Sequence, residues 1–171
     1  IVNIIDYYKN SRGLPVYSET NFDELISDVL STIQYIPERE TVTINTNIKQ
    51  EHVFLSDSTK LRIIFNNLIN NAIKFQDDKK DSSFVNIDIE CTDEIAKIII
   101  EDNGVGISDE DQANIFKMFY RSGAIKSGSG IGLYIVHEAV TKLNGTIKTD
   151  SKIGIGSRFE VTIASMPVDK I

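Results

Sequence analysis

Apolar residues recur at two intervals along this chain, and the interval separates the expected helices from the expected strands. Spacings of three and four residues keep side chains on one helix face, and they predict helices over residues 22–33, 58–75 and 131–143. Alternation and short apolar runs predict strands over residues 41–48, 53–55, 84–91, 95–101, 146–150 and 157–163. The remaining long stretch, residues 102–130, has neither period, and we expect it to be irregular.

Capping residues support these boundaries. Asn21 has a glutamate three positions later, which is a capping pattern, and Asp57 stands where the second helix begins. Asn144 and Gly145 follow the last helix and suit a left-handed stop. The opening residues have helical spacing up to Gly13, and we expect them to be the last turns of a helix that begins upstream.

The order of the elements predicts an α+β fold. Helix, two strands, helix, two strands, an irregular segment, helix and two strands favour helices layered on one face of a mixed, mainly antiparallel sheet. No GxxxxGK[ST] motif occurs, and the glycines at 128, 130 and 132 lack the setting of a dinucleotide fingerprint. The pattern therefore argues against both a P-loop and a Rossmann domain.

Composition narrows the function classes. The 171 residues include 41% hydrophobic and 25% charged residues, which fits one ordinary globular domain. The net charge of −7 and the lack of a basic run argue against nucleic-acid binding, so that any bound phosphate must be held locally.

Cysteine content and hydropathy bear on the compartment. Cys91 is the only cysteine and lies in an alternating apolar strand, which predicts a buried, reduced thiol and a cytoplasmic setting. No apolar run approaches the roughly 20 residues that cross a bilayer, and no signal sequence opens the chain. We expect a soluble, monomeric piece cut from a longer protein, without membrane contact of its own.

Three polar residues of the middle helix are candidates for a metal and phosphate site. Asn67, Asn71 and Lys74 share one stripe at the edge of the apolar face, where amide oxygens and an ammonium suit hydrated magnesium and phosphate oxygens. Asn66 and Asn70 fall further round, and we expect them to face solvent. The alternative is an amphipathic surface helix that happens to be rich in asparagine.

Two glycine-rich turns add further candidates. Asp102 ends a buried strand and is followed by Gly104 and Gly106, so that its carboxylate can accept a hydrogen bond from an exocyclic amine such as that of adenine. The segment SGSGIG, residues 127–132, opens directly into a helix and can bind an anion such as phosphate. The alternatives are a simple aspartate-glycine turn and a flexible linker.

The segment between the two turns carries aromatic and basic residues. Phe116, Phe119 and Tyr120 are predicted to be hydrophobic anchors, with Arg121 and Lys126 beside them. A mobile flap with these cations could close over phosphates. Alternatively, the two phenylalanines are core residues under a loop.

Taken together, these motifs resemble the catalytic ATP-binding domain of bacterial sensor histidine kinases, within the superfamily that includes gyrase, the Hsp90 chaperones and MutL. NNLINNAIKF resembles the N box, DNGVGI the G1 box, IFKMFYR the F box, SGSGIGLYIV the G2 box and GIGSRF the last glycine motif. The resemblance runs from about Asn21 to Ile163. It implies a Bergerat-type two-layer sandwich with an ATP lid. It also implies that residues 15–171 form the catalytic domain and residues 1–14 the end of a dimerisation hairpin and a linker.

The resemblance further implies ATP and Mg²⁺ as ligands and assigns roles to residues. Asn71 and Asn67 would hold the metal, Lys74 and Arg121 would lie near the phosphates, and Asp102 would bind the adenine amine. Asn67, Lys74 and Arg121 would be the catalytic residues. The implied nucleotide-binding set is Asn67, Asn71, Lys74, Asp102, Gly104, Gly106, Ile107, Phe116, Tyr120, Arg121, Gly128, Ser129, Gly130, Ile131, Gly132 and Leu133.

Asn67 separates the branches of the superfamily. Gyrase-like ATPases and anti-sigma serine kinases carry a glutamate base there, and an amide cannot accept a proton from water or serine. A histidine acceptor needs no such base, so we expect γ-phosphoryl transfer from Mg-ATP to a histidine on a hairpin outside this chain. His52 and His137 do not resemble that acceptor.

The expected partners follow from the same resemblance. They are ATP and ADP, the phosphoacceptor hairpin of the same kinase, which dimerises in the full-length protein, and the receiver domain of a response regulator. An inner-membrane sensor is a possible parent. The alternatives are a nucleotide-binding module without catalysis and an ATPase of the gyrase or Hsp90 kind.

Overall fold

The computed structural model describes residues 14–34, 40–122 and 128–166. The helix expected over residues 1–13 therefore lies outside the described residues. The helices are α2 (Phe22–Ile33), α3 (Ser58–Lys74), α4 (Asp109–Gln112) and α5 (Gly132–Lys142). The strands are β1 (Ser18–Thr20), β2 (Val42–Gln50), β3 (Phe54–Ser56), β4 (Ser83–Cys91), β5 (Ile95–Asp102), β6 (Thr146–Lys152) and β7 (Gly156–Ala164).

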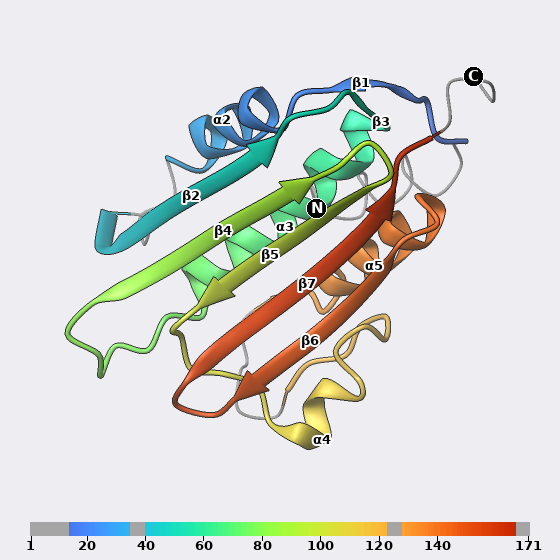
Figure 1. Cartoon of the computed structure of the whole chain (residues 1–171). Coiled ribbons are helices and arrows are strands. Elements are labelled where there is room, and N and C mark those ends of the chain that lie inside the picture. Colours follow the sequence, from blue (N-terminus) through green and yellow to red (C-terminus); the bar gives the residue numbers. More distant parts are fainter. Residues whose placement is uncertain (1–13, 35–39, 123–127, 167–171) are drawn as a thin grey trace.

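The main sheet has five strands in the order β2-β4-β5-β7-β6. β2 runs parallel to β4, and all other neighbours are antiparallel, which confirms the mixed, mainly antiparallel sheet. Figure 1 shows α3 and α5 behind this sheet, and α2 packs against α3 beside β2. The sheet therefore has helices on one face, and its other face is free of them in the part of the chain described.

Two short elements were not predicted. β1 pairs with β3 as a separate two-stranded sheet, and α4 interrupts the segment that we expected to be irregular. β1 has three residues and α4 has four, which is too few for either hydrophobic period to become visible.

The core lies between the sheet and the helices. The predicted apolar face of α3 is buried through Leu61, Ile64, Phe65, Leu68 and Ala72. The inward residues of the three central strands, which alternate along each strand, lie against it: Val85, Ile87, Ile98, Ile100, Phe159 and Val161. Burial of these side chains fixes which way α3 faces, and thereby the direction of its polar edge.

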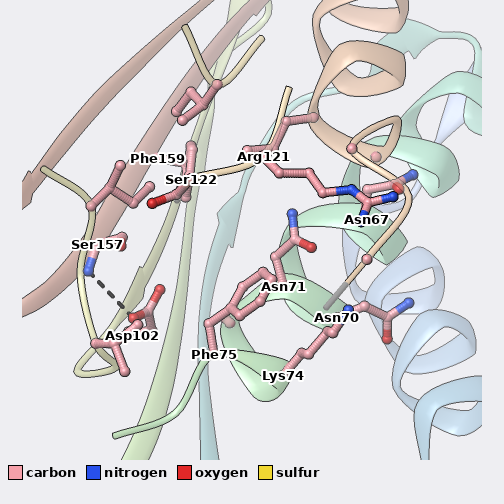
Figure 2. A pocket seen from close by; sticks show the side chains of 18 of the residues that line it. Asn67, Asn70, Asn71, Lys74, Phe75, Asp102, Arg121, Ser122, Ser157 and Phe159 are labelled. Carbon is pink, nitrogen blue, oxygen red and sulfur yellow. Dashed lines mark hydrogen bonds between the residues drawn. The ribbon is translucent and has the colours of Figure 1, made fainter. Parts of the chain in front are cut away.

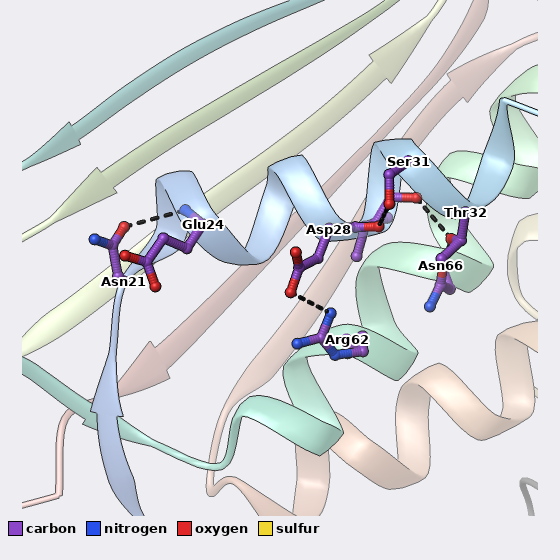
Figure 3. A network of polar contacts seen from close by, with 8 residues as sticks. Asn21, Glu24, Asp28, Ser31, Thr32, Arg62 and Asn66 are labelled. Carbon is purple, nitrogen blue, oxygen red and sulfur yellow. Dashed lines mark hydrogen bonds and ion pairs between the residues drawn. The ribbon is translucent and has the colours of Figure 1, made fainter.

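The contact between α2 and α3 corrects the expectation for Asn66. Figure 3 shows Thr32 of α2 next to Asn66 of α3, with 3.5 Å between the hydroxyl and the amide oxygen, and Asp28 paired with Arg62 at 3.1 Å. Asn66 is half-buried and faces a neighbouring helix. The prediction of a solvent-facing Asn66 is wrong because helix packing covers that side of α3.

The predicted end of α5 and the predicted state of Cys91 are confirmed. Asn144 has a φ of 52° and therefore takes the left-handed conformation that ends the helix. Cys91 is a free, buried cysteine, and burial raises the pKa of its thiol to about 11. A thiol with such a pKa stays protonated and unreactive at neutral pH.

Within the described ranges, we find no helix of the length and apolarity that a membrane span needs.

The N-terminal cap of α3 joins three parts of the fold. Oδ1 of Asp57 accepts hydrogen bonds from the backbone of Thr59 and Lys60 at 2.9 and 3.0 Å. Oδ2 accepts from the backbone of Val16 at 2.9 Å and lies 3.5 Å from the buried ammonium of Lys60. The predicted cap is confirmed, and it also holds the segment before β1.

We expect Asp57→Ala to lower the free energy of unfolding by about 2 kcal/mol, since it removes a helix cap and a tether at once. Asp57→Asn keeps a capping oxygen and should cost about half as much. Urea denaturation at neutral pH measures both values. Equal losses in the two variants would contradict the role given to the cap.

Candidate functional site

A cavity of about 280 Å³ opens beside the C-terminal half of α3, between the turn after β5 and the start of α5. Among the described residues, its walls contain most of the predicted set: Asn67, Asn71, Lys74, Asp102, Gly106, Ile107, Tyr120, Arg121, Gly128, Ser129, Gly130, Gly132 and Leu133. Segments far apart in the chain thus meet in one place, as the predicted site requires. Ser127 and Lys126 lie outside the described residues.

Three predicted residues do not reach the cavity wall. Ile131 is the buried N-cap residue of α5, and Phe116 packs on the core with its ring 5.7 Å from that of His137. Gly104 lies behind the wall, where a side chain would meet the carbonyl oxygen of Phe75 at 2.2 Å. Packing thus keeps the side chains of Phe116 and Ile131 off the cavity wall, whereas Gly104 shapes the turn next to it. Their place in the nucleotide-binding set stays a prediction.

Phe119 is also corrected. It was predicted to be a hydrophobic anchor, but its side chain is 63% exposed and its φ is 63°. Its backbone N–H donates to the carbonyl of Gly130 at 2.9 Å, which joins the two ends of the segment between them. Phe119 therefore acts through its backbone, and the left-handed conformation turns its ring outward.

Eight lining residues were missed by sequence reasoning: Asn70, Ala72, Phe75, Val105, Ile115, Ser122, Ser157 and Phe159. Phe75, Val105, Ile115 and Phe159 sit inside or beside the recognised motifs, and their apolar character matched a core role equally well. Ser157 lies in the GIGSRF motif, but its place beside Asp102 follows only from strand pairing, since Asp102 is its register partner in β5.

Asp102 lies at one end of the cavity, where it is partly buried and accepts hydrogen bonds from the backbone. Its Oδ1 accepts hydrogen bonds from the backbone of Gly104 at 2.8 Å and of Ser157 at 3.3 Å. Burial raises the pKa of Asp102 to about 6, against the lowering effect of these two N–H groups and of Lys80. Neither hydrogen bond uses Oδ2, so that an ionised oxygen remains for a ligand at neutral pH.

This raised pKa predicts a pH-dependent stability. The folded protein holds the proton of Asp102 more tightly than the unfolded chain, so the group stabilises the fold below about pH 4 and loses this contribution as the pH rises to about 6. Asp102→Asn should therefore raise the free energy of unfolding at pH 7 by about 2 kcal/mol and flatten its decline between pH 4 and 6. Thermal or urea unfolding across this range tests it, and an unchanged pH profile would contradict it.

Gly106 brings the turn after β5 close to the β6–β7 hairpin. Its φ is 73°, and a Cβ atom there would lie 2.0 Å from the carbonyl oxygen of Lys152. Only glycine tolerates both the conformation and the approach. The hairpin thereby supports the turn that forms the cavity floor.

Side-chain amides line the other part of the cavity (Figure 2). The amide nitrogen of Asn67 donates to the carbonyl of Ile63 at 2.8 Å, which leaves its Oδ1 beside Gly132. Figure 2 shows Asn71 between Asp102 and Asn67. The predicted stripe of amides therefore does face a cavity, and this excludes a purely solvated helix face.

Asn70 corrects a further expectation. It was predicted to face solvent, yet it lines the cavity, and its Oδ1 is buried without a hydrogen-bond partner in the described part of the protein. A buried amide oxygen without a partner is unfavourable unless a ligand or water satisfies it. Together with the Oδ1 of Asn67, it provides the type of neutral oxygen donor that suits a hydrated cation.

Two cations complete this end of the cavity. The Lys74 ammonium lies 5.2 Å from the centre of the Phe75 ring and near Gly128. Figure 2 shows Arg121 reaching from its loop toward Asn67. No carboxylate pairs with Arg121 among the described residues. Its charge is therefore available to an anion.

Comparison with known proteins identifies this arrangement. Residues 56–167 match the family model described as histidine kinase-, DNA gyrase B- and HSP90-like ATPase. The chain belongs to this ATPase family. Family membership brings ATP binding with it and confirms the expected superfamily.

Two curated relatives are named as sensor kinases. The autoinducer 2 sensor kinase/phosphatase LuxQ of Vibrio cholerae is 35% identical over 135 residues, which are 75% of this chain and 16% of LuxQ. The sensor-like histidine kinase SenX3 of Mycobacterium bovis is 29% identical over 162 residues, 92% of this chain and 39% of SenX3. The chain thus spans less than half the length of these curated relatives. Both of these relatives are sensor kinases.

A solved structure confirms the fold. The catalytic domain of the histidine kinase ThkA matches with a TM-score of 0.75 at 22% identity, over 89% of this chain and 99% of that domain. The sheet with helices on one face is therefore the Bergerat-type sandwich of this ATPase family.

Proposed function

We propose that the domain binds Mg-ATP in this cavity and transfers the γ-phosphoryl group to a histidine on a helical hairpin of the same kinase. The observation that carries the proposal is the polarity of the cavity (Figure 2). Asp102 lies at one end, while amides and two cations, Lys74 and Arg121, lie toward the other. ATP has the same polarity, with an amine on its base and negative charge on its phosphates.

Asp102 recognises the base. Its Oδ2 accepts a hydrogen bond from the exocyclic amine of adenine, while Oδ1 stays bound to the backbone of Gly104 and Ser157. Guanine presents a carbonyl oxygen at this position, which an ionised carboxylate repels. The domain therefore prefers ATP to GTP.

The amides fit a magnesium ion that keeps part of its water shell. Asn71 is the ligand that the family motif assigns, and Asn67 lies beside it with an oxygen not used within the helix. A magnesium ion held by these amides would neutralise part of the phosphate charge. Lys74 and Arg121 contribute two further positive charges, which orient the terminal phosphate without taking part in proton transfer.

The chemistry of the cavity favours transfer over hydrolysis. Asp102 is the only acidic residue among the described lining residues, and it lies at the adenine end. Among the residues described at the phosphate end, no carboxylate lines the cavity to remove a proton from water or serine. A neutral imidazole needs no base: its nitrogen bonds to the γ-phosphorus while the bond to the bridging oxygen breaks, and ADP leaves with that oxygen.

The acceptor histidine belongs to a partner element. His52 and His137 are both exposed and do not line the cavity, so neither replaces it. The hairpin, its dimerisation and a response regulator receiver domain that accepts the phosphoryl group belong to the same proposal. They rest on the sensor kinases among the relatives.

Mixing the domain with a purified hairpin of its parent kinase and γ-labelled ATP tests the function. We expect magnesium-dependent, acid-labile label on the hairpin and none on the domain alone. Bound ATP without label on a competent hairpin would favour a binding module without catalysis. Sustained phosphate release in the absence of a hairpin would favour an ATPase.

A further inference from the structure

Asp111 collects hydroxyl groups from both sides of the loop that carries Arg121. Its Oδ1 accepts from the hydroxyl of Tyr120 at 2.7 Å. Its Oδ2 accepts from Ser122 at 2.7 Å and from Ser108 at 2.8 Å. These hydroxyls, with Ser122 the strongest, lower the pKa of Asp111, as expected for a carboxylate that acts as an acceptor for all of them.

The two loop residues that Asp111 holds are the neighbours of Arg121 in sequence. Tyr120 and Ser122 direct their hydroxyls to Asp111, whereas Arg121 between them reaches toward Asn67 (Figure 2). Restraint on both sides leaves the backbone of Arg121 little freedom. An arginine on a restrained backbone loses less conformational entropy when it binds an anion, because its backbone is already ordered.

Asp111 lies in an element that is hydrogen-bonded to the main sheet. It is in the short helix α4, which Ser108 caps by accepting from the Asp111 backbone N–H at 3.1 Å. The next residue, Gln112, donates to the carbonyl oxygens of Ser151 in β6 at 2.9 Å and of Ile107 at 3.2 Å. Through these hydrogen bonds, the Asp111 carboxylate holds the loop at Tyr120 and Ser122 in a fixed place relative to β6.

We propose that Asp111 is the positioning residue for Arg121 and thereby sets how strongly the domain discriminates ATP from ADP. This inference rests on the proposed function, in which Arg121 contacts the terminal phosphate. Arg121 reaches toward Asn67, far along the cavity from Asp102, where the γ-phosphate of a bound ATP would lie. Loss of Asp111 should thus weaken ATP binding and leave ADP binding nearly unchanged.

A double-mutant cycle tests the inference by calorimetric titration of the whole chain with Mg-ATP and Mg-ADP. Asp111→Ala should weaken ATP binding about 5- to 10-fold and ADP binding less than about 2-fold. Arg121→Ala should weaken ATP binding about 10- to 30-fold. In the Arg121→Ala background, Asp111→Ala should add nothing, because its effect passes through the arginine.

Two further variants guard against effects on folding. Tyr120→Phe combined with Ser122→Ala removes the two loop contacts but keeps Asp111 and its bond to Ser108, and it should reproduce the loss of discrimination. Glu110→Ala removes an equal charge from the adjacent position of α4, whose side chain makes none of these contacts. It should leave both affinities unchanged.

Several results would overturn the inference. Additive losses in the cycle, or equal losses for ATP and ADP, would make Asp111 a structural residue only. If Arg121→Ala left the ratio of the ATP and ADP affinities unchanged, Arg121 would not contact the terminal phosphate and the inference would fail. The domain would still bind ATP in that case. The absence of ATP binding to the unmodified chain would instead refute the proposed function itself.

Discussion

Asp102→Asn is expected to weaken ATP binding by about one to two orders of magnitude, because a hydrogen bond to a charged group contributes about 1.5 to 3 kcal/mol. The structure adds a reason for a large effect. Oδ1 is held by the N–H groups of Gly104 and Ser157, so the asparagine oxygen will keep that position. Its NH₂ group then faces the adenine amine, and two donors oppose each other.

The same geometry predicts a change in base preference. An NH₂ group in place of Oδ2 can donate to the carbonyl oxygen of guanine, so the preference for ATP over GTP should shrink or reverse. Calorimetric titration with ATP and GTP measures both effects.

Glu101→Gln is the matched control for Asp102→Asn. It removes a neighbouring carboxylate that is exposed on the strand and outside the cavity, and it should leave the affinity for ATP unchanged.

The stability prediction for Asp102→Asn provides a second control. Asp102→Asn should bind ATP less tightly while it unfolds less readily at pH 7, so that weaker binding cannot be attributed to a damaged fold. ATP binding at the original strength would mean that the adenine assignment is wrong.

Asn71→Ala should reduce phosphoryl transfer to the hairpin by about 100-fold or more, since it removes the residue that fixes the metal and with it the orientation of the γ-phosphate. Binding should change in a specific way. The part of the ATP affinity that depends on magnesium should be lost, while the affinity measured in excess chelator should remain, because Asp102 and the adenine end are untouched.

Asn66→Ala is the control that this helix offers. It removes the same side chain from the same helix, but Asn66 faces Thr32 of α2 and lies off the cavity. Its transfer rate and magnesium dependence should match those of the unmodified domain. If Asn71→Ala binds ATP with the same magnesium dependence as the unmodified domain, the metal role of Asn71 is refuted.

Much of the fold could be predicted because the information was local. Asn21 and Asp57 cap their helices as expected, with the Glu24 backbone donating to Asn21 and the backbone of Thr59 and Lys60 to Asp57. A cap depends on the residue itself and on the next three positions, so the sequence contains all of it. The hydrophobic periods located the long helices and strands for the same reason.

The errors concern side chains whose direction depends on a distant segment. Asn66 and Asn70 were both expected to face solvent, but α2 covers the first and the cavity receives the second. Phe119 was expected to pack inward, and its backbone conformation turns it out. In each case a helical wheel or a residue type describes the element alone, while its neighbours determine what the side chain meets.

The sequence by itself determined the α+β class, the order of the longer helices and strands and the ATPase family, because periodicity, caps and motif residues depend on neighbours within a few positions. Only the tertiary structure decided which motif residues share a cavity, that Asp102 has a pKa near 6, and that Asp111 joins the loop around Arg121 to α4. These properties arise from burial and from contacts between segments far apart in the chain. Their energies depend on distances that exist only once the chain has folded.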